Sequence, residues 1–462
     1  MARSFVIERS TVLPQSPAEV YAWHARPGAF ERLVPPWEPV EVLERSGGIE
    51  DGARTVLRGR SGPVSWRWTA EHHGHIAGRR FVDEQVAGPF AHWVHTHEFL
   101  PEGSGSRLVD RVEYAPPFGL SGAAADLWLI RPRIARMLAY RHAVTAADLA
   151  DHARHADRPR LHVAITGATG LIGRALSAFL TTGGHRVTAL VRRAPRAGEA
   201  HWDPDRGAID TAPLEDADAI VHLAGENVGG GRWTAERKRR IRESRVGATA
   251  LLANALAAMR HPPRVLIAAS GVGIYGSQGD AVLTEDSAVG PAGDFFVDLA
   301  RDWEAAADTA ERAGIRVAQA RFGVVLSPSG GALAKLLPPF RAGLGGPLGD
   351  GRAWMSWVSR DDAVGAIHHA LFTDTTAAPF NVVAPQPVTN REFTRVLARV
   401  LRRPAVIPVP AAALRLAFGE MADATILSSI RVRPAVLDRE GYRFRHPDLE
   451  TALRNLLGRS GE

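Results

Sequence analysis

The stretch LHVAITGATGLIGR, residues 161–174, decides the fold of the larger part of this chain. Its first six residues are mostly apolar and are typical of a buried strand, and three glycines then open a helical pattern. In a strand–turn–helix unit of this kind one glycine permits the tight turn, the second lets the backbone approach a pyrophosphate and the third packs helix on strand. We expect the following residues to contact a dinucleotide: Gly167, Ala168, Thr169, Gly170, Leu171, Ile172 and Gly173.

The sequence beyond this turn alternates between strand-like and helix-like segments. Short apolar runs recur at 186–192, 219–225, 264–271 and 316–323, with helical patterns between them. Such alternation is typical of a parallel sheet with helices on both faces, so we predict a Rossmann-type, doubly wound α/β domain. Residues 330–462 are richer in proline and glycine and predict a smaller lobe.

Residues 1–150 have a different pattern and predict an α+β domain. A helix-like segment at 121–150, interrupted at Pro132, follows a run of short alternating strands, and a sheet wrapped around one long helix leaves a cavity. The polar segment 151–160 is interpreted as a linker. The predicted strands are 4–13, 39–44, 53–59, 64–72, 78–86, 91–101 and 107–114.

The end of the second apolar run indicates which coenzyme fits. An NAD site usually places an acidic residue about 20 residues after the glycines, where it accepts hydrogen bonds from the ribose hydroxyls. Arg192 and Arg193 stand there instead. A guanidinium cannot accept a hydrogen bond but suits a 2′-phosphate, so we predict NADP(H). Two solvated arginines that bind nothing are the alternative.

Composition excludes several classes of protein. A length of 462 residues suggests about three domains. The chain is 45% hydrophobic and 23% charged, which is an ordinary balance for a globular protein. The chain has no cysteine, so disulfides, thiolate metal sites and cysteine nucleophiles are excluded. The net charge of +6 is modest, and the sequence has neither an apolar run long enough for a membrane span nor a signal-peptide pattern. We expect a cytoplasmic protein.

The motifs TGATGLIG, VHLAGENV, GIYG and ARFGVVL, in this order, resemble the extended short-chain dehydrogenases/reductases. Further segments, among them HLAGENVGGGRWT and GLGGPLGDGRAWMSWV, look like an atypical epimerase-like subfamily over residues 161–457. The resemblance implies an NADP-binding domain at 161–407 and the subfamily's own C-terminal domain at 408–462.

The N-terminal part resembles the helix-grip superfamily of START domains and polyketide cyclases. The resemblance rests on LPQSPAEVYAWHARPGAFERLVPPWE and DEQVAGPFAHWVHTHEF. It implies that residues 1–150 form a domain with a cavity for a hydrophobic ligand.

The family's usual catalytic pair is missing from this sequence. Extended short-chain reductases use a Tyr-x-x-x-Lys pair, and these positions fall on Phe296 and Ala300 here. Ser270 and Tyr275 remain as candidate catalytic residues, although Tyr275 could instead be a packed aromatic and Ser270 a ligand contact. Ligands of open α/β sheets bind at the carboxyl ends of the strands, so the ends of the third and fifth apolar runs give these further expected cofactor contacts: Leu223, Ala224, Gly225, Glu226, Asn227 and Arg321.

Three other patterns are weaker. His95 and His97 would share one face of a strand, but no ligand set is evident beside them, so we expect neutral histidines that line a ligand cavity, and no metal. The basic segment 232–245 is interpreted as a solvated helix start near the cofactor, with no nucleic acid bound. Trp354 and Trp357 belong either to a mobile cover over a ligand or to a packed surface loop.

The sequence therefore supports two functions. The first is an NADP(H)-dependent oxidoreductase or epimerase that acts on a small carbonyl or hydroxyl compound, for example a sugar nucleotide or a hydrophobic molecule. The alternative is a non-catalytic NADP(H) sensor with a separate apolar-ligand cavity in its N-terminal domain. The oligomeric state is left open.

Overall fold

A computed structural model describes residues 4–61, 64–117, 119–373 and 379–460. The chain divides into two compact units, Met1–Asp157 and the residues from Arg158 onward, with the short segment Thr181–Gly184 grouped with the first. Each unit is described by itself. In the described ranges, no helix combines the length and the apolar character that crossing a membrane requires.

The first unit contains one antiparallel sheet of seven strands in the order β1-β7-β6-β5-β4-β3-β2. Two short helices, α1 (Pro17–Ala25) and α2 (Ala29–Leu33), follow β1, and Ser16 caps α1 through a capping box with Glu19. All seven predicted strands are confirmed. Their bounds are β1 Phe5–Leu13, β2 Val40–Ser46, β3 Arg54–Ser61, β4 Val64–Ile76, β5 Arg80–Ala87, β6 His92–Glu102 and β7 Gly105–Ala115.

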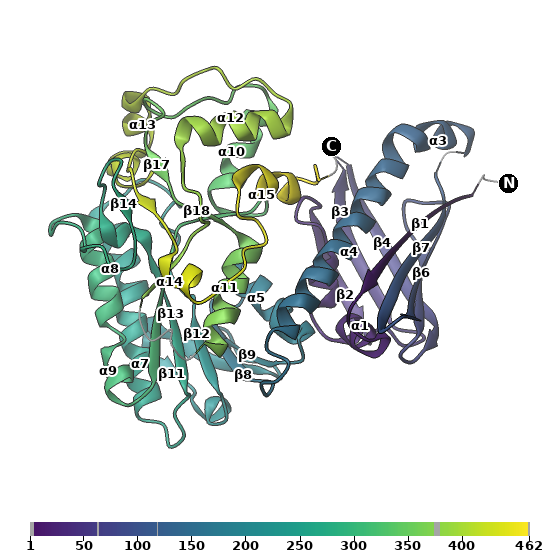
Figure 1. The fold of residues 1–462 in the computed structure, drawn as a ribbon, viewed down its shortest axis with the longest axis horizontal. Coiled ribbons are helices and arrows are strands. Elements are labelled where there is room, and N and C mark those ends of the chain that lie inside the picture. Colours follow the sequence, from purple (N-terminus) through teal and green to yellow (C-terminus); the bar gives the residue numbers. More distant parts are fainter. Residues whose placement is uncertain (1–3, 62–63, 118, 374–378, 461–462) are drawn as a thin grey trace. The chain divides into compact units, whose positions relative to one another are not determined.

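One long helix, α4 (Arg131–Ala153), lies across this sheet (Figure 1). It follows α3 (Gly119–Ala125) and a π-helical turn at Asp126–Ile130. Pro132 sits in the first turn of α4, where a proline costs no hydrogen bond, so the predicted interruption is a helix start. Ile134 and Leu138 of α4 pack on the aromatic residues of β6 and β7, and helix and sheet share one core.

The second unit contains an eight-stranded sheet in the order β11-β10-β9-β8-β12-β13-β15-β19. All neighbours pair in parallel except β10 and β11, which are antiparallel. The predicted Rossmann-type sheet is confirmed. The strand bounds are β8 His162–Thr166, β9 Arg186–Val191, β10 Glu199–Asp203, β11 Ala208–Ile209, β12 Ala219–His222, β13 Val265–Gly271, β15 Arg316–Phe322 and β19 Phe380–Val382.

Both faces of this sheet are covered by helices (Figure 1). Along β8 the odd-numbered Val163 and Ile165 pack against α5 (Leu171–Thr182) and α11 (Arg360–Phe372), while Ala164 faces α7 (Ala248–Ala257). Because both faces are buried, the strands are apolar runs and not alternating ones. The remaining helices beside this sheet are α6 Ala235–Arg242, α8 Phe295–Ala305 and α9 Asp308–Arg312.

The C-terminal part adds a helical lobe with its own core. Side chains from α10 (Gly331–Arg341), α12 (Asn390–Leu401) and α15 (Leu449–Leu456) meet in one apolar cluster. The smaller elements are β14 Val282–Leu283, β16 Val324–Leu326, β17 Trp354–Met355, β18 Trp357–Ser359, β20 Val388–Thr389, α13 Ala411–Phe418, β21 Arg431–Val432 and α14 Ala435–Arg439.

Candidate functional site

The glycine turn joins β8 to α5 through two glycines that the fold itself requires. Gly167 has a φ of 68°, and a Cβ there would lie 2.9 Å from the backbone of Leu223. A Cβ on Gly173 would lie 2.2 Å from the Gly167 carbonyl oxygen. A Cβ on Gly170 would meet only that same oxygen, at 3.1 Å. The open side of Gly170 is thus available to a bound group, at a helix N-terminus that favours anionic oxygens.

The other residues of the turn divide between core and surface. Ala168 and Ile172 pack against the sheet core, and Leu171 lies against Gly330. Thr169 is exposed, and its carbonyl oxygen accepts a hydrogen bond from Arg174. The apolar members of the motif therefore anchor the turn, and its middle faces solvent.

Arg192 and Arg193 follow β9 directly, but they differ in their partners. The Arg193 guanidinium donates to both carboxylate oxygens of Glu199 at 2.7 and 2.6 Å, and this ion pair lowers the pKa of Glu199. Arg192 is 73% exposed and lies 3.7 Å from Asp205. Arg192 can therefore meet a phosphate without breaking a close ion pair, whereas Arg193 must first leave Glu199.

The loop after β12 lies beside the glycine turn, because β12 pairs in parallel with β8 and their carboxyl ends share one sheet edge. The backbone amides of Leu223 and Ala224 donate to Thr166 Oγ1 at 3.1 and 3.2 Å. The Glu226 amide donates to Ser244 Oγ at 3.0 Å, and Asn227 Oδ1 accepts from Gly229 at 3.0 Å.

The guanidinium of Arg245 also contacts the loop 223–227 and holds it in place. It donates to the Glu226 carbonyl oxygen at 3.1 Å, and it lies 3.4 Å from the position of a Cβ on Gly225. Burial lowers the pKa of Arg245 to about 10. The predicted contacts 223–227 therefore form a loop fixed on one side and exposed on the other.

Three predicted site residues and Glu304 form one buried hydrogen-bond network at the carboxyl ends of β13 and β15. Ser270 Oγ donates to Glu304 Oε1 at 2.7 Å, and the Arg321 guanidinium donates to both Glu304 oxygens at 2.8 Å each. Arg321 also donates to the Tyr275 hydroxyl at 2.9 Å. The structure thus brings Ser270, Tyr275 and Arg321 together around Glu304.

Both hydrogen-bonding directions of the Tyr275 hydroxyl are occupied. It accepts from Arg321 and donates to Asn381 Oδ1 at 2.9 Å, and the side chain is fully buried. Burial raises the pKa of Tyr275, although Arg321 opposes the rise. A hydroxyl in this state holds its proton firmly.

The positions of the usual tyrosine and lysine lie on α8 and are apolar. Phe296 packs against Trp233 with 5.1 Å between ring centroids. Ala300 is buried in the same apolar cluster as Tyr275. Neither side chain can exchange a proton, so any proton transfer at this site must use other groups.

The loop at 343–358 is held by both of its tryptophans. Trp354 Nε1 donates to Asp280 at 2.7 Å, and Arg431 stacks on the ring at 4.0 Å. Trp357 is fully buried and donates to the Gln386 carbonyl oxygen at 2.9 Å. These contacts favour the packed-loop alternative over a mobile cover.

The basic segment 232–245 forms α6 and a π-helical turn. Its charges lie beside acidic partners: Arg240 with Glu236 at 3.8 Å, and Arg239 with Glu243 at 3.5 Å. A helix whose cations are neutralised in this way fits a solvated surface.

The first unit encloses a cavity of about 690 Å³ between the sheet and α4. Most of its lining is apolar and includes Trp66, Trp68, Phe81, Phe90, Trp93 and Ile134. The predicted cavity is confirmed, and the predicted cavity-lining histidines His95 and His97 are among its wall residues.

Two aspartates that the sequence analysis missed flank these histidines. Strand register places Asp83 of β5 opposite His95, and Asp110 of β7 opposite His97. His97 Nδ1 lies 2.6 Å from Asp110, and His97 Nε2 lies 3.2 Å from Asp83. Burial opposes protonation of His97, but Asp110 and Asp83 together raise its pKa to about 9. The sequence could have indicated both aspartates only if the alternation of side chains along each strand had been combined with the register between neighbouring strands.

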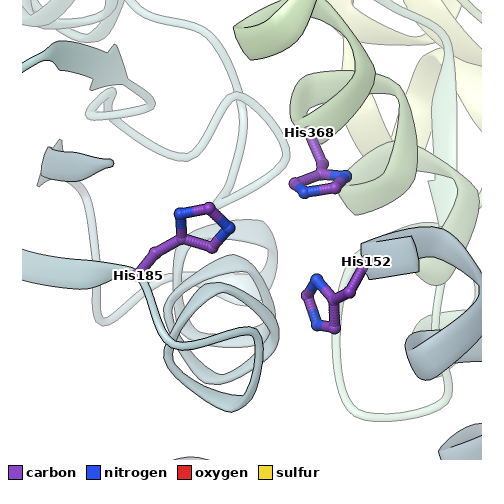
Figure 2. A group of neighbouring side chains, drawn as sticks. All are labelled: His152, His185 and His368. Carbon is purple, nitrogen blue, oxygen red and sulfur yellow. The ribbon is translucent and has the colours of Figure 1, made fainter. Parts of the chain in front are cut away.

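A second pair of histidines lies in the other unit. Figure 2 shows His185, just before β9, beside His368 of α11, and their ring centroids are 5.9 Å apart. His185 Nδ1 accepts from the Leu161 amide at 3.0 Å. This bond joins the residue before β8 to the residue before β9.

Comparisons with known proteins match three regions. The NAD dependent epimerase/dehydratase family matches residues 163–384, the polyketide cyclase / dehydrase and lipid transport family matches 13–143, and a domain of unknown function matches 409–456. An epimerase family protein of Mycobacterium tuberculosis (strain CDC 1551 / Oshkosh) is 42% identical over 300 residues, which are 65% of this chain and 98% of the relative.

Among the solved structures that resemble the chain, two examples are more than 30% identical to it. The crystal structure of a nucleoside-diphosphate sugar epimerase from Corynebacterium glutamicum has a TM-score of 0.81 and 35% identity, and the match covers 98% of this chain and 90% of that one. Human epimerase family protein SDR39U1 (isoform 2), crystallised with NADPH, has a TM-score of 0.59 and 36% identity, with coverage of 64% and 99%.

Proposed function

Because the chain belongs to the NAD dependent epimerase/dehydratase family, we propose that its second unit binds NADP(H) and acts on a small carbonyl or hydroxyl compound. The observation that carries the proposal is the glycine turn with its exposed centre at Gly170, next to the loop 223–227 at the same sheet edge. Ligands of open α/β sheets bind at this edge. The similarity to a human relative crystallised with NADPH supports the same coenzyme.

Coenzyme choice in this proposal depends on Arg192. The exposed Arg192 guanidinium would meet the 2′-phosphate, and Glu199 would keep Arg193 in place beside it. The carboxylate of Glu199 is engaged by Arg193, so it is a poor acceptor for the ribose hydroxyls of NAD. This arrangement favours NADP(H) over NAD(H).

Ser270 and Tyr275 are the proposed catalytic hydroxyls. When bound, the nicotinamide supplies or accepts the hydride. Tyr275 would exchange a proton with the substrate oxygen after its bond to Asn381 breaks, and Ser270 would orient that oxygen while Glu304 holds the serine. Arg321, bonded to the Tyr275 hydroxyl, would stabilise a phenolate there. The proposed substrate is a sugar nucleotide or a hydrophobic molecule that carries this carbonyl or hydroxyl group.

One observation favours a second function, NADP(H) binding without turnover. The Tyr275 hydroxyl already has a donor and an acceptor in a fully buried position, and Phe296 and Ala300 replace the usual proton-transfer pair. In that case the first unit would bind an apolar ligand in its cavity and the second would sense the coenzyme.

Titration calorimetry of NADPH and NADH tests the coenzyme proposal. We expect the wild type to prefer NADPH, and Arg192→Ala to lose at least tenfold in NADPH affinity without change toward NADH. Arg206→Ala is the matched control, because this exposed arginine lies nearby after β10 and faces Asp203. If neither nucleotide binds, or if both variants behave alike, the coenzyme proposal is wrong.

A substrate screen by nicotinamide absorbance then separates the two functions. Turnover that Tyr275→Phe abolishes, with NADPH affinity unchanged, supports the enzyme. Tight NADPH binding with no turnover on any carbonyl, hydroxyl or sugar-nucleotide compound supports the sensor.

A further inference from the structure

The cavity of the first unit contains a group of side chains that the proposed function does not use. Three neighbouring strands contribute to it: Asp83 from β5, His95 and His97 from β6, and Asp110 from β7. The two histidines alternate with outward-facing residues, so both point to the inner face of the sheet. Cross-strand pairing then places one aspartate beside each imidazole.

Three ligand-type atoms converge on one point of this group. His95 Nδ1 and His97 Nε2 lie 3.3 and 3.2 Å from the same oxygen, Asp83 Oδ2. Ligand atoms that sit about 2.0–2.2 Å from a tetrahedral metal ion are themselves about 3.3 Å apart. Two edges of the triangle formed by these atoms therefore match a coordination sphere, and all three atoms lie within 4.8 Å of one another.

Asp110 lies on the other side of both imidazoles. Its Oδ1 is 2.6 Å from His97 Nδ1 and 3.6 Å from His95 Nε2. Metal-bound histidines usually direct their second ring nitrogen at a carboxylate, which fixes the tautomer and turns the lone pair to the metal. Asp110 is fixed in turn, because His142 Nε2 lies 3.1 Å from its Oδ2 and His142 Nδ1 lies 2.8 Å from Thr11 Oγ1.

The group is buried, since the side chains of His95 and His97 are 1% and 4% exposed. A cation bound there would be neutralised by the carboxylates of Asp83 and Asp110, so no unpaired charge would be left in the cavity wall.

We propose that Asp83, His95 and His97 bind one divalent transition-metal ion, with Asp110 as the carboxylate that orients His97. The three ligands line the cavity, whereas Asp110 is outside its lining, so the open coordination positions face the cavity. Two histidines and one carboxylate with open positions suit zinc or non-haem iron(II).

The cavity defines the chemical class of the further ligand. Its walls are mostly apolar, and Arg141 adds a cation to the same lining. We infer an apolar molecule with a carbonyl or carboxylate oxygen, which would occupy the open position of the metal ion and be held by Arg141.

Metal binding to the full chain, expressed without a histidine tag and stripped with a chelator, tests the site. Cobalt(II) is titrated first, since its visible absorption reports coordination number, and zinc(II) and anaerobic iron(II) then compete for the site. We expect one ion per chain. His97→Gln should weaken binding at least 100-fold, and Asp110→Asn about 10- to 100-fold.

Two further variants keep the test decisive. His92→Ala is the matched control, because His92 lies on the same strand but on its outward face, and we expect it to bind as the wild type does. Asp83→Asn preserves the shape of a partly exposed residue and should fold even if the histidine variants do not. The proposal is overturned if the wild type binds no ion, or if Asp83→Asn and His97→Gln bind it as tightly as His92→Ala. NADPH calorimetry on the same samples reports separately on the second unit.

Discussion

The hydroxyl of Thr166 donates a hydrogen bond to Nδ1 of His222 over 2.7 Å. The direction follows from the other bonds of this oxygen, which accepts from the amides of Leu223 and Ala224 and so keeps its proton for the ring. Thr166 ends β8 and His222 ends β12, and both are fully buried. One side chain thus ties two strand ends to the loop that is proposed to contact the coenzyme.

Removing this hydroxyl should weaken the nucleotide site. Thr166→Val keeps the β-branched shape but leaves the Ala224 amide and one imidazole nitrogen without this partner, at a cost of about 1–3 kcal/mol. The Leu223 amide keeps only its bond to the Thr166 carbonyl oxygen, at 3.3 Å. We expect a lower urea midpoint and NADPH affinity reduced several-fold, because the loop 223–227 loses its anchor.

Thr188→Val is the control for that variant. Thr188 Oγ1 makes the same kind of contact, 2.8 Å to His162 Nε2, but at the amino end of β8. It should lower the urea midpoint without changing NADPH affinity. Equal losses of affinity in the two variants would contradict the assignment of the loop to the coenzyme site.

His222 should make the second unit sensitive to acid. Burial lowers its pKa to about 4, so the folded state disfavours the charged ring. Stability from this group is full above the unfolded pKa of about 6.5 and falls as the pH drops toward 4. At pH 5 the loss relative to pH 7 is about 2 kcal/mol.

Urea unfolding of wild type and His222→Asn at pH 7 and pH 5 measures this loss. Asparagine keeps an acceptor near the Nδ1 position but does not titrate, so the variant should lose less stability between the two pH values. Titrating groups elsewhere affect both proteins equally and cancel in the comparison. Identical pH dependence in the two proteins would show that His222 is not the titrating group.

The sequence predicted elements better than it predicted side-chain partners. The seven strands of the first unit and the parallel sheet of the second follow from periodicities that each segment carries locally. The pairing of Arg193 with Glu199 and of Asp83 with His95 depends on strand register, which joins residues that no local pattern connects.

The buried network around Glu304 illustrates the same limit. Glu304 was not among the predicted site residues, yet its carboxylate accepts hydrogen bonds from both Ser270 and Arg321. A single helix residue shows no sign of this role, because its partners come from the ends of two different strands. Only the side-chain geometry shows that the candidate residues Ser270 and Tyr275 belong to one hydrogen-bond network.

The three glycines of the turn should respond differently to the same added methyl group. Gly170→Ala meets one oxygen at 3.1 Å, so we expect a change in melting temperature of only a few degrees but NADPH binding reduced at least tenfold, since the methyl group would face the pyrophosphate. Gly173→Ala would place the methyl group 2.2 Å from a carbonyl oxygen and should destabilise the unit severely. Thermal melts with and without NADPH distinguish the two, and a Gly170→Ala protein that binds NADPH normally would refute the role of Gly170.

The contributions of Glu304 and Arg321 to the free energy of unfolding of the second unit should depend strongly on each other. Both side chains are largely buried, at 13% and 7% exposure. Glu304→Gln leaves the Arg321 guanidinium charged and unpaired among buried groups, which costs about 3–5 kcal/mol. The double variant Glu304→Leu/Arg321→Met replaces the pair with apolar side chains of similar size, and we expect it to be more stable than Glu304→Gln. Urea unfolding of Glu304→Leu, Arg321→Met and the double variant gives the coupling energy, and losses that simply add would mean that the two charges do not depend on each other.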